Sequence, residues 1–133
     1  MAFSHLGRCL ITGDNLGNIT YFNSSLRNIR LISEKDAHAG SPVRGVSFSP
    51  NDTKFLSSGD DGSVKVWDWE TATVEHNYTE HLSDVRCSDW HPFRSLVCSG
   101  SKDNTLKLWD PRQSESLCSV YLHKSSIFCC KFN

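Results

Sequence analysis

The sequence lacks the features that mark several large classes of protein. Acidic and basic residues nearly balance, at 15 against 14, so no excess of positive charge points to a stand-alone nucleic-acid binder. No apolar run is long enough to span a bilayer, and the first residues do not have the layout of a secretory signal. We therefore expect an intracellular protein with no membrane partner. Sustained helical periodicity is also missing, which predicts an all-β fold.

Motifs for metal or cofactor chemistry are missing too. The six cysteines form no CxxC pair and match no common ligand spacing. Four of them fall inside predicted strands, where free thiols are expected to be buried as small apolar groups: Cys87, Cys98, Cys118 and Cys129. His76, His81 and His91 lie in three different predicted elements without a complementary cysteine or acidic residue. The glycines form no phosphate-binding loop, so we predict no metal, no cofactor and no small-molecule substrate.

The chain does contain a repeat. The stretch His81–Arg112, HLSDVRCSDWHPFRSLVCSGSKDNTLKLWDPR, aligns with residues 42 positions earlier, so that Trp109 falls on Trp67. The earlier copy has four β-type runs, PVRGVSFS, TKFLSSG, SVKVWDW and TVEHNYT, and the later copy has DVRCSDW, SLVCSG, TLKLWD and SLCSVYL. A first copy is degenerate, with Phe22 where tryptophan stands later, and SIFCCKFN is predicted to begin a fourth.

A repeat of this length, opened by His and closed by Trp-Asp, resembles the WD-repeat family of β-propellers. In that family each repeat supplies about one four-stranded blade. The resemblance implies an all-β partial propeller with two full blades plus parts of two more, a fragment of a seven-bladed propeller. We predict an incomplete degenerate blade at 1–35, blades at 36–80 and 81–122, and the first strand of the next blade at 123–133. Closure with further chains and a truncated gene product are the alternatives to a fragment.

Each good copy holds a His, a Ser, an Asp and a Trp at matching positions: His38, Ser57, Asp61 and Trp67, then His81, Ser99, Asp103 and Trp109. Hydrolases also combine Ser, His and Asp. An active site is needed once, however, whereas this set recurs at the blade period. In the WD-repeat family these positions form a hydrogen-bonded tetrad, so the resemblance implies two structural tetrads and no catalytic residue.

Charged residues are the remaining candidates for binding. Five are expected near the rim of the central channel: Arg44, Asp60, Asp84, Arg86 and Lys102. Arg44 and Arg86 occupy equivalent positions, and arginine can bind phosphate or carboxylate through two parallel hydrogen bonds. We predict partner contacts at these residues. The competing interpretation is a solvated ion pair with Asp60 or Asp84.

The order of repeats permits a narrower comparison. LITGDNLGNITYF, then SFSPNDTKFLSSGDDGSVKVWDW, then DVRCSDWHPFRSLVCSG is similar to the WD-repeat subunits of cleavage and polyadenylation specificity factors. This resemblance implies a non-enzymatic nuclear scaffold that supports polyadenylation-signal recognition and complex assembly. Its implied partners are a large multi-propeller subunit and a zinc-finger subunit, with pre-mRNA contacted indirectly or through parts outside this chain. The alternative is a WD-repeat adaptor that binds peptide motifs, as in a ubiquitin-ligase substrate receptor or a trafficking coat.

Overall fold

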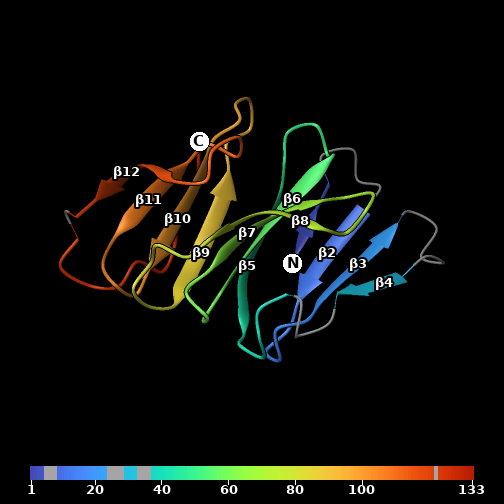
Figure 1. Ribbon diagram of the computed structural model, residues 1–133, viewed down its shortest axis with the longest axis horizontal. Coiled ribbons are helices and arrows are strands. Elements are labelled where there is room, and N and C mark those ends of the chain that lie inside the picture. Colours follow the sequence, from blue (N-terminus) through green and yellow to red (C-terminus); the bar gives the residue numbers. More distant parts are fainter. Residues whose placement is uncertain (5–8, 24–28, 33–36, 122) are drawn as a thin grey trace.

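The computed structural model describes residues 1–4, 9–23, 29–32, 37–121 and 123–133. Within these ranges the protein is all-β, and no helix is long and apolar enough to cross a membrane. Its strands form three four-stranded antiparallel sheets, each following the order of the chain (Figure 1). The fold is therefore a partial β-propeller in which each sheet is one blade.

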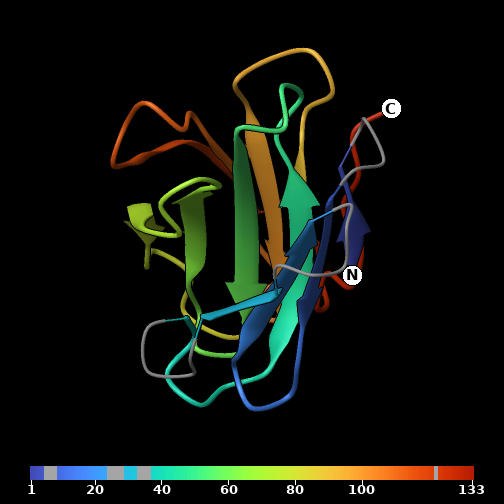
Figure 2. The same ribbon diagram turned by 90° about the vertical axis from the view of Figure 1, so that its right-hand side faces the viewer.

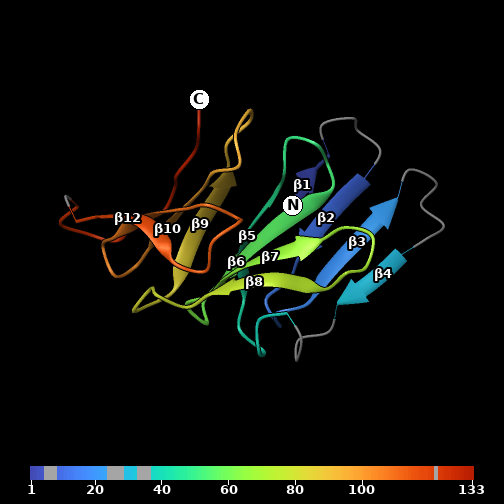
Figure 3. The same ribbon diagram turned by 45° about the horizontal axis from the view of Figure 1, so that its top comes forward.

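The three blades are built from successive strands. Blade A contains β1 (Ala2–Phe3), β2 (Cys9–Gly13), β3 (Ile19–Asn23) and β4 (Ile29–Ile32). Blade B contains β5 (Val43–Phe48), β6 (Lys54–Gly59), β7 (Val64–Asp68) and β8 (Val74–Tyr78). Blade C contains β9 (Val85–Trp90), β10 (Val97–Ser101), β11 (Leu106–Trp109) and β12 (Ser116–Val120). Figures 1 and 3 show the three sheets side by side, with blade B between the other two, and Figure 2 shows the molecule from the end at which blade A lies.

Both faces of blade B are apolar. Successive side chains of a strand point to opposite faces of the sheet, so one strand can contribute to two cores. Phe55 of β6 joins a core shared with blade A, whereas the next residue, Leu56, joins a core shared with blade C. On β7, Trp67 and Val66 divide between the same two cores. This explains why β10 (VCSGS) and the part of β6 after Lys54 (FLSSG) consist of apolar or small residues throughout.

The sheets approach closely where the sequence has small residues. A Cβ added at Gly13 of blade A would lie 2.5 Å from Cγ1 of Val43 in blade B. Between blades B and C, a Cβ at Gly45 would lie 2.6 Å from the Ser58 hydroxyl oxygen and 2.8 Å from that of Ser88. Glycine therefore permits close contact between β2 and β5 at Gly13 and between β5 and β9 at Gly45.

The blade expected at the start of the chain is present, whereas the strand expected at its end is not. Blade A, expected to be incomplete, has a first strand, β1, of only two residues beside β2, β3 and β4. Residues 126–133, expected to form a strand, form none, and the Ile127 N–H donates to the Ser101 carbonyl at 3.0 Å. A single bond of this kind does not make a ladder, and a strand requires a ladder with a neighbour.

The cysteine prediction was wrong for two of its four residues. Cys98 is buried and Cys87 half-buried, but Cys118 and Cys129 are exposed. Cys118 lies on β12, the outermost strand of blade C, which has no further strand beside it in the described chain. Cys130, which was not among the four, is buried instead. All six cysteines lie in the described part of the chain, and none of them forms a disulfide.

Candidate functional site

The first set of His, Ser, Asp and Trp comes together inside blade B. His38 lies before β5, Ser57 on β6, Asp61 in the turn after β6, and Trp67 on β7. The Nδ1 atom of His38 is 2.9 Å from Asp61 Oδ1, and its Nε2 atom is 2.7 Å from Ser57 Oγ. Trp67 Nε1–H donates to the same Ser57 oxygen at 2.9 Å. One consistent pattern follows: the imidazole N–H donates to Asp61, and the serine hydroxyl donates to Nε2 while accepting from the indole.

The second set repeats this geometry in blade C. His81 is 3.0 Å from Asp103 Oδ2 and 2.7 Å from Ser99 Oγ, and Trp109 Nε1–H donates to Ser99 at 2.8 Å. Burial opposes the charged form of Asp103, but hydrogen bonds from Thr105, Leu82 and His81 outweigh it and lower the pKa of Asp103 to about 2. Burial also lowers the pKa of His81, although Asp103 opposes that shift.

Two hydroxyl residues belong to these networks and were missed from the sequence. Ser63 Oγ–H donates to the carboxylate of Asp61 at 2.8–2.9 Å, and Thr105 Oγ1–H donates to Asp103 at 2.6 Å. Burial opposes ionisation of Asp61, yet the bonds from His38 and Ser63 leave its pKa lowered. A signal was available, because a hydroxyl residue stands two positions after the aspartate in both good copies.

Blade A has no such network among its described residues. Thr12 is the residue of blade A that corresponds to Ser57, because Thr12 pairs with Thr20 two residues before Phe22, as Ser57 pairs with Lys65 two residues before Trp67. The Thr12 hydroxyl donates only to the Thr20 carbonyl, at 3.4 Å. Phe22 has no N–H to donate, so the indole-to-hydroxyl bond of the other blades has no counterpart here.

The five charged candidates come together at the end of blades B and C where β5 and β9 begin; we call them the charged network. Arg44 binds Asp60 through Nε at 2.9 Å and through Nη2 at 2.5 Å. Arg86 lies 2.8 Å from Asp84 and 3.6 Å from Asp60, and Lys102 lies 3.9 Å from Asp84. Three cations therefore alternate with two carboxylates.

The charged network leaves one positive charge in excess and keeps some donors available. The hydrogen bond from Arg44 lowers the pKa of Asp60 against the effect of burial, and the same bond raises the pKa of Arg44. Lys102 and Arg44 are exposed, with 55% and 40% of their side-chain surfaces accessible. Arg86 Nε is buried and has no acceptor among the described residues. An anionic group could therefore bind at the exposed cations without breaking the central Arg86 pairs.

A pocket of about 310 Å³ lies beside the charged network, with Asp60, Asp84 and Leu82 in its wall. Leu82 is 92% exposed, so an apolar side chain projects next to the charged residues. Among the described residues, no group of three or more His, Cys, Asp or Glu side chains is arranged to hold a metal ion. The arrangement places exposed cations, two carboxylates and an exposed apolar side chain side by side at one end of blades B and C.

Three sheets of four antiparallel strands, two of which carry a His-Ser-Asp-Trp network, define a protein built from WD repeats. The family model "WD domain, G-beta repeat" matches residues 29–68 and 72–110, and this chain belongs to that family. Over 127 residues, or 96% of its length, the chain is 39% identical to Polyadenylation factor subunit 2 of Neurospora crassa. It is 38% identical over 127 residues to the protein of the same name from Gibberella zeae.

A relative with a different name also matches. The chain is 34% identical over 116 residues, or 84% of its length, to the human Peroxisomal targeting signal 2 receptor. The chain spans only a fraction of each relative: 19% of the Neurospora protein, 20% of the Gibberella protein and 35% of the human receptor. It is thus similar to a part of each, across adjacent blades.

Proposed function

We propose that this chain belongs to a non-enzymatic scaffold subunit of the nuclear machinery for pre-mRNA 3′-end cleavage and polyadenylation. The single observation that carries the proposal is the 39% identity to Polyadenylation factor subunit 2 across 96% of the chain. In this proposal the blades support recognition of the polyadenylation signal and assembly of the complex. The partners are a large multi-propeller subunit and a zinc-finger subunit, and pre-mRNA is contacted indirectly or outside these residues.

The geometry supports a scaffold rather than a catalyst. Each Ser-His-Asp set is engaged with a buried tryptophan, so the serine hydroxyl is hydrogen-bonded within the blade at both its donor and its acceptor positions. Ser57 and Ser99 are both 0% exposed. A nucleophile must reach its substrate, and these two hydroxyls do not reach the surface.

Within this proposal the charged network is a partner-binding site. Arg44 and Lys102 are its exposed cations, and Arg86 with Asp60 and Asp84 holds them in place. The pair Arg44→Ala and Lys102→Ala tests the site without removing the central arginine. Lys124→Ala is a matched control, since Lys124 is an exposed lysine outside the network.

The test is affinity purification of the tagged full-length protein from its own cells, followed by mass spectrometry and imaging. We expect subunits of the 3′-end processing machinery to copurify, the protein to be nuclear, and the double variant to lose partners that the control retains. Copurification of unrelated complexes alone overturns the proposed function. Retention of every partner by the double variant overturns the role of the charged network and leaves the scaffold function standing.

A peptide-binding adaptor in another complex is the second candidate. The similarity to a relative named as a receptor for a targeting signal favours it, as does the exposed Leu82 next to exposed cations. A ubiquitin-ligase substrate receptor or a trafficking coat subunit would fall in this class. In the purification above, recovery of cargo proteins or ligase subunits in place of processing factors would favour it.

A further inference from the structure

A second pocket lies at the opposite end of blades B and C from the charged network. It has a volume of about 240 Å³ and is bounded by the turn between β5 and β6, the turn between β9 and β10, and the residues after β11. Lys54 begins β6, whereas Asp60 of the charged network follows the end of that strand. The two places are thus separated by the length of the strand. Every residue that bounds this pocket is described, and both blades that form it are complete.

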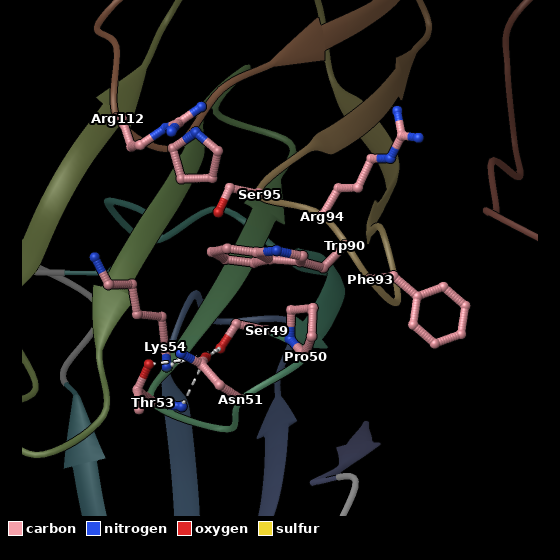
Figure 4. A pocket seen from close by; sticks show the side chains of 11 residues that line it. Ser49, Pro50, Asn51, Thr53, Lys54, Trp90, Phe93, Arg94, Ser95 and Arg112 are labelled. Carbon is pink, nitrogen blue, oxygen red and sulfur yellow. Dashed lines mark hydrogen bonds between the residues drawn. The ribbon is translucent and has the colours of Figure 1, made fainter.

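The pocket has cationic side chains at its edges and no carboxylate in its wall. Lys54, Arg94 and Arg112 are its three cations. Lys54 is paired with Glu75 at 2.5 Å and Arg112 with Asp110 at 2.7 Å. Arg94 is exposed and has no ion pair in the described chain. Figure 4 shows Lys54 and Arg112 on one side of the Trp90 ring and Arg94 on the other, so a ligand lying across the ring would meet positive charge at both ends.

Trp90 provides a second, independent indication of a ligand. Its side chain is part of the pocket wall, and the residue is only 6% exposed. Its indole Nε1–H is buried and has no acceptor among the described residues. Trp67 and Trp109, in contrast, each donate to a serine. Buried indole N–H groups usually find an acceptor, and this one is closed off from the surface, so an acceptor that enters the pocket would pair with it only after a shift of the ring.

The remaining wall is apolar and favours a peptide over a nucleic acid. Pro50 and Pro111 line it together with the indole. Sites for single-stranded nucleic acid need exposed aromatic faces on which bases stack. The Trp90 ring is buried, and Phe93, 88% exposed and turned away from Trp90 in Figure 4, is the one exposed aromatic ring among the residues of the pocket, so successive bases would have no second face on which to stack. A peptide that combines carboxylates with apolar side chains matches both the cations and the apolar wall.

We propose that this pocket, with Trp90 in its wall and Arg94 at its edge, binds a short acidic segment of a partner protein. Carboxylates of the segment pair with Arg94 and with Arg112 or Lys54, and an apolar side chain lies against Pro50, Pro111 and the indole. The proposal concerns a surface separate from the charged network and does not depend on which complex the protein joins.

The experiment selects peptides from a random 12-residue library displayed on phage, using the immobilised full-length protein. Selected peptides are then synthesised, and their Kd values are measured for the wild type, Arg94→Glu and Lys124→Glu. Arg94 and Lys124 are both exposed, so the two variants make the same charge change without disturbing the core. An eight-nucleotide oligouridylate is titrated in parallel.

We expect selected peptides with two or more Asp or Glu residues beside an apolar residue, and affinity at least about tenfold weaker for Arg94→Glu, the loss of roughly one charge-assisted contact. Lys124→Glu should change the affinity less than about twofold. Trp90→Phe, which keeps the ring and removes the donor, should weaken the same peptides. The proposal is overturned if no acidic peptide depends on Arg94. It is also overturned if the oligouridylate depends on Arg94 and the peptides do not, which would assign the pocket to RNA.

Discussion

Removal of the Ser99 hydroxyl should destabilise blade C strongly, because that one group holds two buried partners. It accepts from Trp109 Nε1 at 2.8 Å and is hydrogen-bonded to His81 Nε2 at 2.7 Å. Ser99 and Trp109 are 0% exposed, and His81 is 7% exposed. Ser99→Ala leaves one donor and one acceptor without partners, at about 1–3 kcal/mol each. We therefore expect a loss of about 2–4 kcal/mol, a large part of the typical stability of a domain.

The matched control is Thr12→Val in blade A. Thr12 occupies the register position of Ser99, but its hydroxyl makes one 3.4 Å bond and the residue is half-buried. Valine keeps the shape and removes only the hydroxyl, so the cost should stay below about 1 kcal/mol. Native-state hydrogen exchange of the full-length protein, followed by mass spectrometry, measures both effects locally. Peptides from β9–β11 should lose about 30-fold or more of their protection in Ser99→Ala, and peptides from β2–β3 should change little in Thr12→Val.

A double-mutant cycle isolates the cause. In a Trp109→Phe background the indole donor is already absent, so Ser99→Ala should cost at least about 1 kcal/mol less than it does in the wild type. The explanation is refuted if Ser99→Ala costs no more than Thr12→Val, or if its effect is the same with and without the indole.

Three further predictions follow from buried groups and close contacts. Folding lowers the pKa of Asp103 from 3.8 to about 2, so the stabilisation from this carboxylate is present above pH 4 and is lost as the pH falls from about 4 to 2. Folding also lowers the pKa of His81, so further stability is lost as the pH falls below 6.5. Urea midpoints measured against pH should show a smaller loss between pH 4 and 2 in Asp103→Asn than in the wild type, with the remainder due to other carboxylates of lowered pKa such as Asp61. Tyr78 donates to two backbone carbonyls, and burial raises its pKa to about 12, so ultraviolet titration should show a phenol ionising near pH 12 that Tyr78→Phe lacks. Gly100→Ala would place a Cβ 2.5 Å from Ile127 Cγ2 and should detach residues 125–133 from blade C, seen as faster proteolysis of that segment, while Gly40→Ala, with no atom within 4 Å, should not.

The sequence predicted the sheets well because their information is local and repeated. Trp67 and Trp109 stand 42 residues apart, and their strands have the same register and the same irregularity just before the tryptophan. The repeat also predicted which four residues of blades B and C would meet. Prediction from the sequence failed where a strand or side chain depends on a neighbouring strand that is distant along the chain. The strand expected at 126–133 depends on a ladder that the described chain does not supply, and burial of Cys118 depends on a strand beyond β12.

Pairing within the charged network was equally hard to predict, since it depends on rotamers rather than spacing. Asp60 could have paired with Arg44 or Arg86, and in the structure it contacts both. The pocket around Trp90 could not be predicted from any sequence motif. Its walls come from three turns that belong to different blades, and only their juxtaposition shows that the indole N–H lacks an acceptor.

The tetrads and the charged network are physically linked, and this affects how variants should be interpreted. Asp61 of the blade B tetrad directly follows Asp60 of the network, and Asp103 of the blade C tetrad directly follows Lys102. Hydrogen bonds to the two tetrad aspartates therefore fix the turns that carry network residues. A variant such as Ser57→Ala should weaken partner binding at the network without touching it, because the turn after β6 loses its anchor through His38. Loss of binding in a tetrad variant consequently does not identify a contact residue. Only exposed changes that leave hydrogen-exchange protection intact, such as Arg44→Ala, can assign a direct contact.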